Sequence, residues 1–300
     1  MEWVLNEVVR GYKMACYNPV GTYRSDGSPS YRPCGQCIGC RLEYSRCWAV
    51  RCTHEASLYE SNCFLTLTYN NDQIPSDGSL KKSDLQKFMK RLRRKYEDKT
   101  IRYFGCGEYG EKFSRPHYHL CLFNLDFPDR QIFKVGKKTA FRHYFKKGHD
   151  HSVYTSEVLG KVWQKGFHTI GELTFDSAAY VARYVTKKVT GEKKNQWYKG
   201  KQPEFALMSR RPGIGYDWIK KYKNDVYPKD FHTLNGNKMR PNRYYDSYCE
   251  KVDKKMFDEL KKKRRYKGEN KKYESHLRQW QKERHRKSIT KLLERELENA

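Results

Sequence analysis

The sequence has little apolar content and lacks any long hydrophobic run. Hydrophobic residues make up 37% of its 300 residues, and no stretch reaches the roughly 18 consecutive apolar residues that a transmembrane helix needs. The N-terminal segment MEWVLNEVVRGYK carries Glu2 and Glu7 where a secretory signal would have basic residues and then an apolar stretch. We therefore expect an intracellular protein with no membrane association, and we do not expect one core to cover the whole chain.

The sequence also lacks a phosphate-binding loop of the form G-x₄-G-K-[ST]. The segment GKKTA at Gly136 has no upstream glycine at the required spacing. The chain therefore has no visible ATP-driven motor of its own.

Acidic residues are scarce relative to basic ones. Lys and Arg number 62 against 35 Asp and Glu, which gives a formal net charge of +27. Such an excess indicates a polyanionic partner, and the 24 Tyr, 14 Phe and 6 Trp offer flat faces on which unpaired bases can stack. Charge alone does not separate DNA, RNA and an acidic membrane surface as partners.

Cysteines are too few for a disulfide scaffold. Ten among 300 residues is well below the roughly 8 to 10% of small disulfide-rich domains, so we expect reduced thiols. Cys34, Cys37, Cys40 and Cys47 nevertheless cluster within PCGQCIGCRLEYSRC. Two interpretations stay open: a structural Zn²⁺ held by these thiolates, or reduced and partly buried thiols, because three cysteines this close in sequence need not all reach one ion.

Helical and extended patterns alternate along the chain, which predicts an α+β fold with one mainly antiparallel sheet and flanking helices. The expected strands are residues 62–69, 101–109, 116–123, 167–175 and 203–210. The expected helices are residues 41–61, 83–96, 152–167 and 176–191, a short one near 216–222, and a charged one from 251 onward that breaks near Gly268. Ser83 and either Asp176 or Ser177 are the expected N-caps of two of these helices.

Two histidines stand one residue apart in HYHLCLF. On a strand, His117 and His119 would project from one face about 7 Å apart, close enough to share a cation. Glu108 on the preceding strand could supply an oxygen ligand; Glu111 competes with it but falls in the expected turn. Two imidazoles and a carboxylate leave coordination positions open, as a catalytic metal site needs. The alternative is that these are ordinary surface or packing histidines.

Two tyrosines stand four residues apart on the helix expected over 176–191. Tyr180 and Tyr184 would share one helix face, with Lys187 and Lys188 a turn further on. A phenolic oxygen can act as a nucleophile on a phosphate whose charge a cation neutralises. The alternative is aromatic packing of the helix on the sheet.

The order of the motifs CFLTLTYN, GEYGEKFSRPHYHLCLF and AAYVARYVTKKV resembles that of HUH endonucleases. The chain looks most similar to the rolling-circle replication initiators of the Microviridae, the small single-stranded-DNA phages, and of their gokushovirus branch in particular. The resemblance runs from about residue 30 to about residue 220. One departure is Tyr118, which stands between the two histidines where the family has an aliphatic residue.

The resemblance implies an enzyme that nicks one DNA strand at a viral replication origin. In such enzymes the histidine pair, here His117 and His119, holds Mg²⁺ or Mn²⁺ with an acidic ligand that corresponds best to Glu108. The tyrosine pair corresponds to Tyr180 and Tyr184; either would attack the scissile phosphate, giving a 5′-phosphotyrosyl intermediate and a free 3′-OH primer, with later religation. A lysine that assists corresponds to one of the pair that follows, Lys187 or Lys188.

The same resemblance implies partners and a location. The partners would be single-stranded DNA with the viral origin, and a host helicase and polymerase; the location would be the cytoplasm of an infected bacterial host. The expected division of the chain is a Cys-rich segment (1–60), an HUH nicking core (61–192), an extension of strand, turn, helix and Tyr-rich loop that contacts DNA (193–249), and a basic helical tail (250–300).

Clusters of basic residues are the candidate DNA contacts, although such runs are more often solvated faces. The candidates are Arg91, Arg93, Arg94, Arg183, Arg210 and Arg211, with the KKKRR run at 261–265 in the tail. Two alternatives to a replication initiator remain open at this stage. One is a relaxase or transposase with the same chemistry, and the other is a non-catalytic, zinc-containing protein that binds or packages single-stranded DNA.

Overall fold

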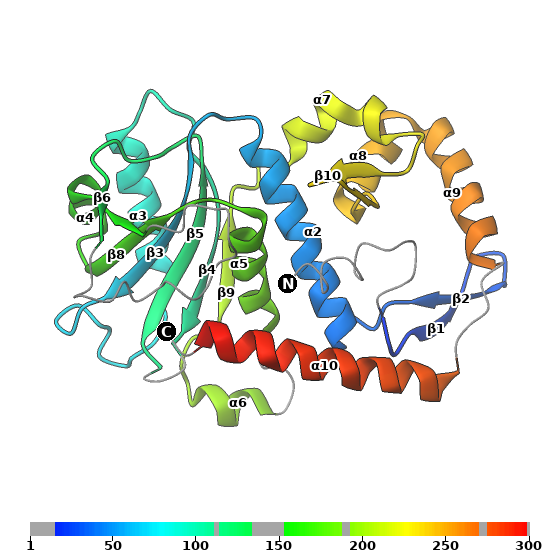
Figure 1. Ribbon diagram of the computed structural model, residues 1–300, viewed down its shortest axis with the longest axis horizontal. Helices are drawn as coiled ribbons and strands as arrows, with labels where there is room; N and C mark the ends of the chain where they lie inside the picture. The colour runs from blue at the N-terminus through cyan, green and yellow to red at the C-terminus, as the bar shows by residue number, and fades with distance from the viewer. Residues whose placement is uncertain (1–15, 111–113, 134–152, 188–192, 270–274, 299–300) are drawn as a thin grey trace. The chain divides into compact units, whose positions relative to one another are not determined.

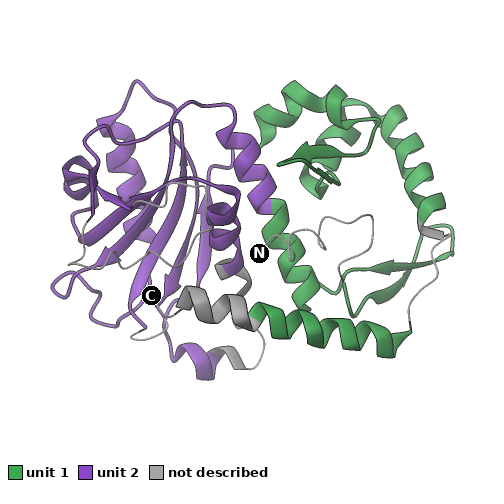
Figure 2. Cartoon of the chain, viewed as in Figure 1, with its two compact units in different colours: residues 1–47, 215–293 green, residues 48–214, 294–300 purple. Residues whose placement is uncertain are grey.

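The structure is a computed structural model that describes residues 16–110, 114–133, 153–187, 193–269 and 275–298 (Figure 1). The chain forms two compact units, coloured separately in Figure 2. Unit 1 comprises residues 1–47 and 215–293, and unit 2 comprises residues 48–214 and 294–300. Within the described ranges, no helix combines the length and the apolar character that a membrane span requires. The four segments expected from the sequence stay a prediction.

Unit 2 is built on an antiparallel sheet with the strand order β6-β7-β8-β3-β5-β4-β9. The strands are β3 (Asn62–Tyr69), β4 (Arg102–Tyr109), β5 (Pro116–Phe123), β6 (Gln131–Ile132), β7 (Tyr154–Thr155), β8 (Gly166–Gly171) and β9 (Phe205–Met208). Helices pack on both faces, so the α+β class is confirmed. The predicted hairpin is present as β4 and β5, and β5 lies between β3 and β4.

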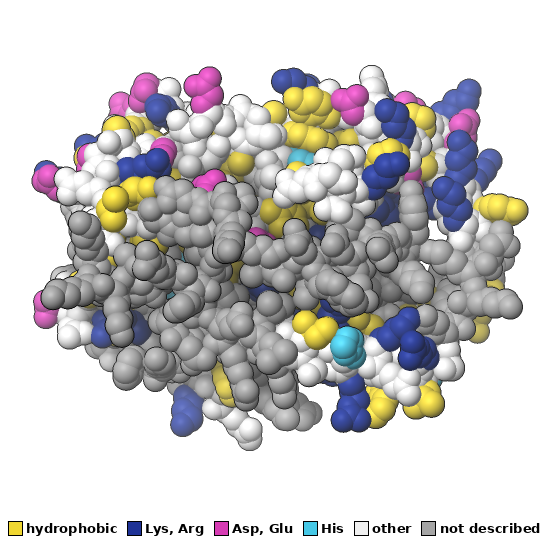
Figure 3. Space-filling view, viewed as in Figure 1, with side chains coloured by type: hydrophobic (Ala, Val, Ile, Leu, Met, Phe, Trp, Pro, Cys, Tyr) yellow, Lys and Arg dark blue, Asp and Glu magenta, His cyan; other side chains and the backbone are white. Residues whose placement is uncertain are grey.

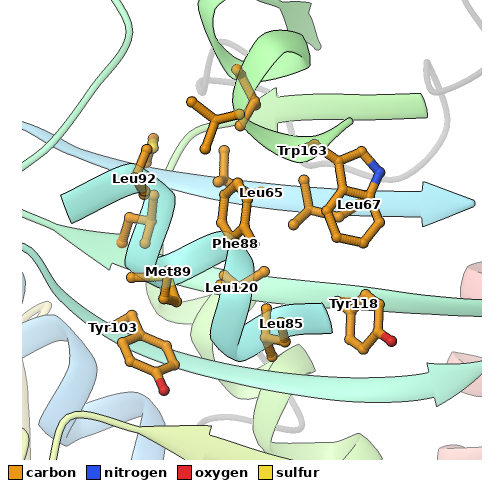
Figure 4. Packing of buried hydrophobic residues seen from close by; sticks show 14 of the residues in the cluster. Leu65, Leu67, Leu85, Phe88, Met89, Leu92, Tyr103, Tyr118, Leu120 and Trp163 are labelled. Atoms are coloured by element: carbon orange, nitrogen blue, oxygen red, sulfur yellow. The ribbon is translucent and has the colours of Figure 1, made fainter. Parts of the chain in front are cut away.

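The pleat of β3 separates two hydrophobic clusters on opposite faces of the sheet. Leu65, Leu67 and Tyr69 are fully buried on one face, and the residues between them are half-buried on the other, as the alternation predicts. The first face is covered by α3 (Lys82–Lys95) and α4 (Glu157–Trp163), and we call it the α3 face (Figure 4). The other, called the α5 face, is covered by α5 (Phe175–Lys187) and by the last turns of α2 (Ile38–Ala56). The short helix α6 (Lys193–Tyr198) precedes β9.

A buried network of hydroxyl groups ties β5 to the α3 face. The Tyr118 hydroxyl lies 2.7 Å from that of Tyr69, and it donates a 3.0 Å hydrogen bond to the carbonyl of Lys81 and accepts one of 3.1 Å from its N–H. The Tyr69 hydroxyl also lies 2.7 Å from Asp84 Oδ2. Burial is the main reason that the pKa of Tyr118 rises to about 12, so the phenol stays protonated and the network intact.

Three helix starts differ from the sequence predictions. Helix α3 begins at Lys82, and Ser83 does not cap it. Helix α5 begins at Phe175 because Thr174 and Ser177 exchange hydrogen bonds: the Ser177 N–H donates to Thr174 Oγ1 at 3.1 Å, and the Thr174 N–H donates to Ser177 Oγ at 2.8 Å. Helix α4 starts only at Glu157, after β7, since Ser156 Oγ accepts the Leu159 N–H.

Unit 1 contains two hairpins and a set of helices. Its elements are β1 (Val20–Tyr23), β2 (Pro29–Arg32), the α2 residues up to Cys47, α7 (Tyr216–Val226), β10 (His232–Leu234), β11 (Asn237–Met239), α8 (Arg243–Val252), α9 (Lys254–Glu269) and α10 (His276–Glu298). The charged tail is helical as predicted, and α9 ends next to the predicted break at Gly268. Arg264 of α9 is held between two carboxylates, with hydrogen bonds of 3.0 Å to Asp230 Oδ2 and 2.7 Å to Asp246 Oδ2.

The prediction of a Tyr-rich loop up to Cys249 is wrong. That stretch holds the β10–β11 hairpin and α8. The hairpin turns through Asn235 and Gly236, both with positive φ (49° and 75°), which is the Asn-Gly signal of a tight hairpin turn. Asn242 caps α8 by accepting the Tyr245 N–H at 3.1 Å. The loop expected before Cys34 is likewise a hairpin, β1–β2.

A buried ion pair in unit 2 gives a stability prediction. Glu55 of α2 pairs with Arg102 of β4, and Arg102 also donates to the carbonyls of Pro212 and Gly213 at 3.0 and 3.1 Å. Glu55→Gln leaves the Arg102 charge buried without its carboxylate, so we expect the free energy of unfolding, from urea titration, to fall by about 3 kcal/mol. Asp77→Asn breaks the exposed pair with Lys81 and should cost less than about 1 kcal/mol. Equal losses in the two variants would contradict this ranking.

Candidate active site

The central three strands of the unit 2 sheet bring together the residues predicted as metal ligands. In the register, Glu108 of β4 stands opposite His117 of β5, and both histidines project from the α5 face. Glu108 Oε1 lies 2.6 Å from His117 Nε2 and 2.7 Å from His119 Nε2. One ligand atom from each residue lies within 4.8 Å of the other two, so the three could hold a metal ion. Glu111, the competing carboxylate, lies outside the described residues.

Both imidazoles are oriented from their other nitrogen. His117 Nδ1 lies 3.0 Å from the Arg115 carbonyl, and His119 Nδ1 lies 3.0 Å from Thr66 Oγ1 of β3. When the Nδ1 atoms carry the protons, they donate to these oxygens, and both Nε2 lone pairs are available to a cation. Thr66 did not stand out in the sequence, and its place opposite His119 in the register is the signal that identifies it.

The site is buried and its electrostatics favour an ionised Glu108. Burial raises the pKa of that carboxyl, but the charges and hydrogen bonds of His119 and His117 outweigh burial and hold it below its usual value. Glu108 exerts the opposite effect on His117, whose pKa rises although burial lowers it, while burial of His119 prevails and lowers its pKa. The second carboxylate oxygen, Oε2, is buried and has no hydrogen-bond partner among the described residues.

These features fit a divalent cation. An unpartnered buried carboxylate oxygen is costly unless a positive charge or a donor satisfies it. Two imidazole nitrogens and a carboxylate on one side of an ion leave room for further oxygen ligands, whereas closed structural sites use four protein ligands. The side chain of His117 is 16% exposed, against 3% for Glu108, so the site opens at His117.

One of the two predicted nucleophiles lies beside the histidines. The Tyr180 ring of α5 packs edge-on against His119, with ring centroids 5.0 Å apart, and against Phe64 of β3 at 6.4 Å. Phe64 in turn stacks on His119 at 5.6 Å. Tyr184 and Lys187 are also on α5, but their side chains lie outside the described residues, as does the whole of Lys188. Tyr180 thus joins the α5 face next to His119.

The predicted DNA-contact arginines are in different places. Arg91 and Arg93 lie on α3, across the sheet from the histidines, where they donate to the carbonyls of Val162 and Ile101 at 2.8 and 3.0 Å. Both therefore have a structural role in holding loops against the α3 face. The remaining candidates are spread over three elements: Arg94 is exposed on α3, Arg183 is half-buried on α5, and Arg210 and Arg211 are exposed at the turn after β9.

The basic run 261–265 divides in the same way. Its first three lysines and Arg265 are exposed on α9, and Lys and Arg side chains gather at this part of the visible surface in Figure 3. Arg264 is the exception because it is paired with the two buried carboxylates described above.

The cysteine cluster has a different membership from the one predicted. Cys16, Cys34, Cys37 and Cys40 place their sulfur atoms within 4.8 Å of one another, and we call this group the four-cysteine cluster. Cys47 is not part of it, because it lies two helical turns beyond Cys40 on α2, where its sulfur is 3.5 Å from Glu43 Oε1. The missed ligand, Cys16, is separated from Cys34 by the β1–β2 hairpin, whose pairing returns the chain to the same place.

The geometry of the four-cysteine cluster suits a tetrahedral ion. The sulfur atoms of Cys34 and Cys40 lie 4.0 Å apart, and those of Cys37 and Cys16 lie 3.9 Å apart; four thiolates about 2.3 Å from one zinc ion would be about 3.8 Å apart. Backbone N–H groups point at the sulfurs, including Cys34 N–H to Cys16 Sγ at 3.2 Å. Although burial opposes ionisation of Cys34, the N–H groups of Cys37 and Gln36 contribute to lowering its pKa to about 7.

Comparison with known proteins finds relatives of this chain among phage replication proteins. The family model for the replication-associated protein ORF2 matches residues 62–189. Replication-associated protein ORF2 of Spiroplasma virus 4 is 37% identical over 248 residues, which cover 77% of this chain and 72% of that protein. Replication-associated protein VP4 of Bdellovibrio phage phiMH2K is 35% identical, covering 73% and 67% respectively. Replication-associated protein ORF4 of Chlamydia phage 1 is 31% identical, covering 73% of this chain and 54% of the relative. No solved structure matches this chain.

Proposed function

We propose, from the premise that this chain belongs to the family of phage replication-associated proteins, that it initiates rolling-circle replication by nicking one DNA strand through attack of a tyrosine. The observation that carries the proposal is the position of Tyr180, whose ring lies 5.0 Å from that of His119 on the same face of the sheet. The ion-binding residues and a phenol are thus neighbours. The net charge of +27 supports DNA as the substrate.

Glu108, His117 and His119 would hold Mg²⁺ or Mn²⁺, both of which accept carboxylate and imidazole ligands. A cation bound there would polarise a phosphate oxygen and offset the charge that develops at phosphorus. The residues around the site support this role without the ion: Thr66 and the Arg115 carbonyl orient the imidazoles, and Phe64 and Tyr180 enclose the His119 side of the site.

In the nicking step, the phenolic oxygen of Tyr180 or Tyr184 forms a bond to phosphorus while the bond between phosphorus and the 3′ oxygen breaks. The phenol loses its proton and the released 3′ oxygen takes one up. The products are a 5′-phosphotyrosyl link and a free 3′-OH that can prime synthesis. Because the link conserves the phosphodiester bond energy, religation needs no nucleotide cofactor. Lys187 or Lys188 would stabilise the negative charge on the attacking oxygen.

The two tyrosines lie one helical turn apart on α5, and we propose that they alternate. One would hold the DNA end while the other makes the next cut. Duplex unwinding and synthesis would depend on a host helicase and polymerase in the cytoplasm of the infected bacterium. Exposed Arg94, Arg210 and Arg211 and half-buried Arg183 would contact the phosphates of the bound strand.

A covalent-trapping experiment tests the proposal. Purified protein is incubated with the circular single-stranded genome of its own phage and Mg²⁺ or Mn²⁺, denatured, and analysed for protein that stays attached to DNA. We expect an adduct that forms with the divalent ion and is absent with chelator. Binding without any adduct would favour the non-catalytic single-stranded-DNA binding or packaging protein. A relaxase or transposase would also form an adduct, but on target DNA other than the replication origin.

We further propose that the four-cysteine cluster of Cys16, Cys34, Cys37 and Cys40 holds a structural Zn²⁺. A zinc ion would link the segment before β1 to the start of α2, in a part of unit 1 where the hairpin strands are largely exposed.

The ligand set gives a prediction with a matched control. Protein purified without chelator should contain about one zinc per chain by mass spectrometry of the metal. Cys16→Ser should lose most of that zinc, whereas Cys47→Ser should keep it, because Cys47 lies outside the cluster. A Cys47→Ser protein without zinc, beside a Cys16→Ser protein that retains it, would restore the ligand set expected from the sequence.

A further inference from the structure

An exposed aromatic residue stands in the same cross-strand row as the metal-site residues. Phe167 of β8 is opposite Thr68 of β3, Thr68 is opposite His117, and His117 is opposite Glu108. Residues opposite each other in a sheet project from the same face, so all four belong to the α5 face. Phe167 is two strands away from His117, roughly 10 Å, since neighbouring strands are about 4.8 Å apart. Its side chain is 66% exposed.

A surface pocket adjoins this phenyl ring. Its volume is about 410 Å³ and its lining is Asn70, Asn71, Asp72, Arg115 and Phe167. That volume lies within the range of roughly 300 to 1,000 Å³ that is typical of small-ligand sites. Arg115 fixes the lining by donating 2.8 Å and 2.7 Å hydrogen bonds to the Tyr69 carbonyl and to Asn71 Oδ1. Arg115 also presents its own carbonyl to His117, so the pocket and the metal site share a segment.

The lining chemistry favours a base over a phosphate. The guanidinium of Arg115 is engaged by protein oxygens, and the Asp72 carboxylate would repel a phosphate. Since Asn71 accepts from Arg115 through Oδ1, its amide nitrogen remains as a donor, and Asp72 offers acceptors. A donor and an acceptor beside a flat apolar ring match the polar edge and the face of a nucleobase.

We infer that this Phe167 pocket binds an unpaired nucleobase of the DNA strand a few nucleotides from the scissile phosphate. The base stacks on Phe167, and its polar edge bonds to Asn71 and Asp72. The inference rests on the proposed function for its substrate, single-stranded DNA. It adds a positioning site: a base held in the row of His117 and Glu108 fixes where the strand crosses the sheet, and therefore which phosphate reaches the metal and Tyr180.

The test is binding of fluorescent oligothymidylate, measured by anisotropy in EDTA and about 0.15 M salt, where long-range charge effects are screened. Phe167→Ala should weaken binding roughly tenfold, as expected for loss of one stacked base. Phe167→Trp should bind like the unaltered protein because it keeps a flat ring. Trp197→Ala, which removes an aromatic side chain of similar exposure (69%) from α6, should change binding less than about twofold. The same oligomer built of abasic sugars should bind Phe167→Ala and the unaltered protein equally.

Two results would overturn the inference. One is Phe167→Ala binding within about twofold of the unaltered protein, and the other is an equal loss on the abasic strand, which would place the backbone against Phe167. Because binding is measured without a divalent ion, its outcome is independent of nicking. A chain that forms the covalent adduct but has no Phe167 effect refutes the pocket alone, and one that shows the Phe167 effect but never forms an adduct refutes the proposed function alone.

Discussion

A chain carrying both Tyr180→Phe and Tyr184→Phe will form no covalent adduct with single-stranded phage DNA, and its nicking rate will fall at least about 10³-fold. The double variant removes two hydroxyl groups and keeps both rings, so the packing of Tyr180 on His119 and Phe64 is preserved. Nicking is measured with an end-labelled oligonucleotide that contains the mapped cleavage site, and the adduct by its slower migration after denaturation.

Single variants and a remote control sharpen this prediction. Tyr180→Phe and Tyr184→Phe should each retain a first cut if the two phenols substitute for one another, but each should lose transfer of the held end to a second strand. Tyr96→Phe removes a hydroxyl on the opposite side of the sheet, where the ring packs on Phe127, and should behave like the unaltered chain. A double variant that still formed the adduct would refute tyrosine attack by this pair.

Glu108→Gln should abolish most of the activity by removing the charge that the ion needs. The substitution preserves the shape of the side chain and leaves both histidines in place, so we expect Mn²⁺ affinity from calorimetry to fall at least about tenfold and nicking at least about 100-fold. Nicking by the unaltered chain should stop in chelator and return when Mg²⁺ or Mn²⁺ is added in excess. The order in which the two ions restore activity will identify the preferred one.

A histidine elsewhere in the same sheet supplies the control. His168 of β8 lies 2.9 Å from Thr155 Oγ1 on the side of α4, away from Glu108. His168→Gln should keep Mn²⁺ binding, even where it lowers stability. Unchanged Mn²⁺ affinity in Glu108→Gln, with a normally folded protein, would show that the ion binds elsewhere.

The parts of the site that the sequence predicted correctly are those that depend on local geometry. His117 and His119 share a face because a strand has a period of two, and Glu108 reaches them because a hairpin pairs adjacent strands. Tyr180 needed one further condition, that α5 packs on the histidine face. The motif order of the family indicated this packing, whereas helical periodicity alone would have placed the tyrosine in any packed helix.

The parts that the sequence could not predict depend on pairing between distant segments or on competition for hydrogen bonds. Cys16 joins Cys34 through a hairpin of mostly exposed residues, which has little hydrophobic pattern. Arg91 and Arg93 look like phosphate contacts in sequence, but they donate to backbone carbonyls of loops that pack beside α3. Phe167 is one of many aromatic residues, and only the sheet register aligns it with His117.

The phenol network around Tyr118 gives the chain a fixed parity. A slip of β5 by one residue would turn Tyr118 toward the α5 face and both histidines into the hydrophobic cluster beneath α3. The hydrogen bonds of Tyr118 to Tyr69 and Lys81 oppose that slip. They act from the side of the sheet where no chemistry takes place. The length of the turn between β4 and β5 can therefore vary without inverting the strand, since the position of the histidines is counted from Tyr118 and not from the turn.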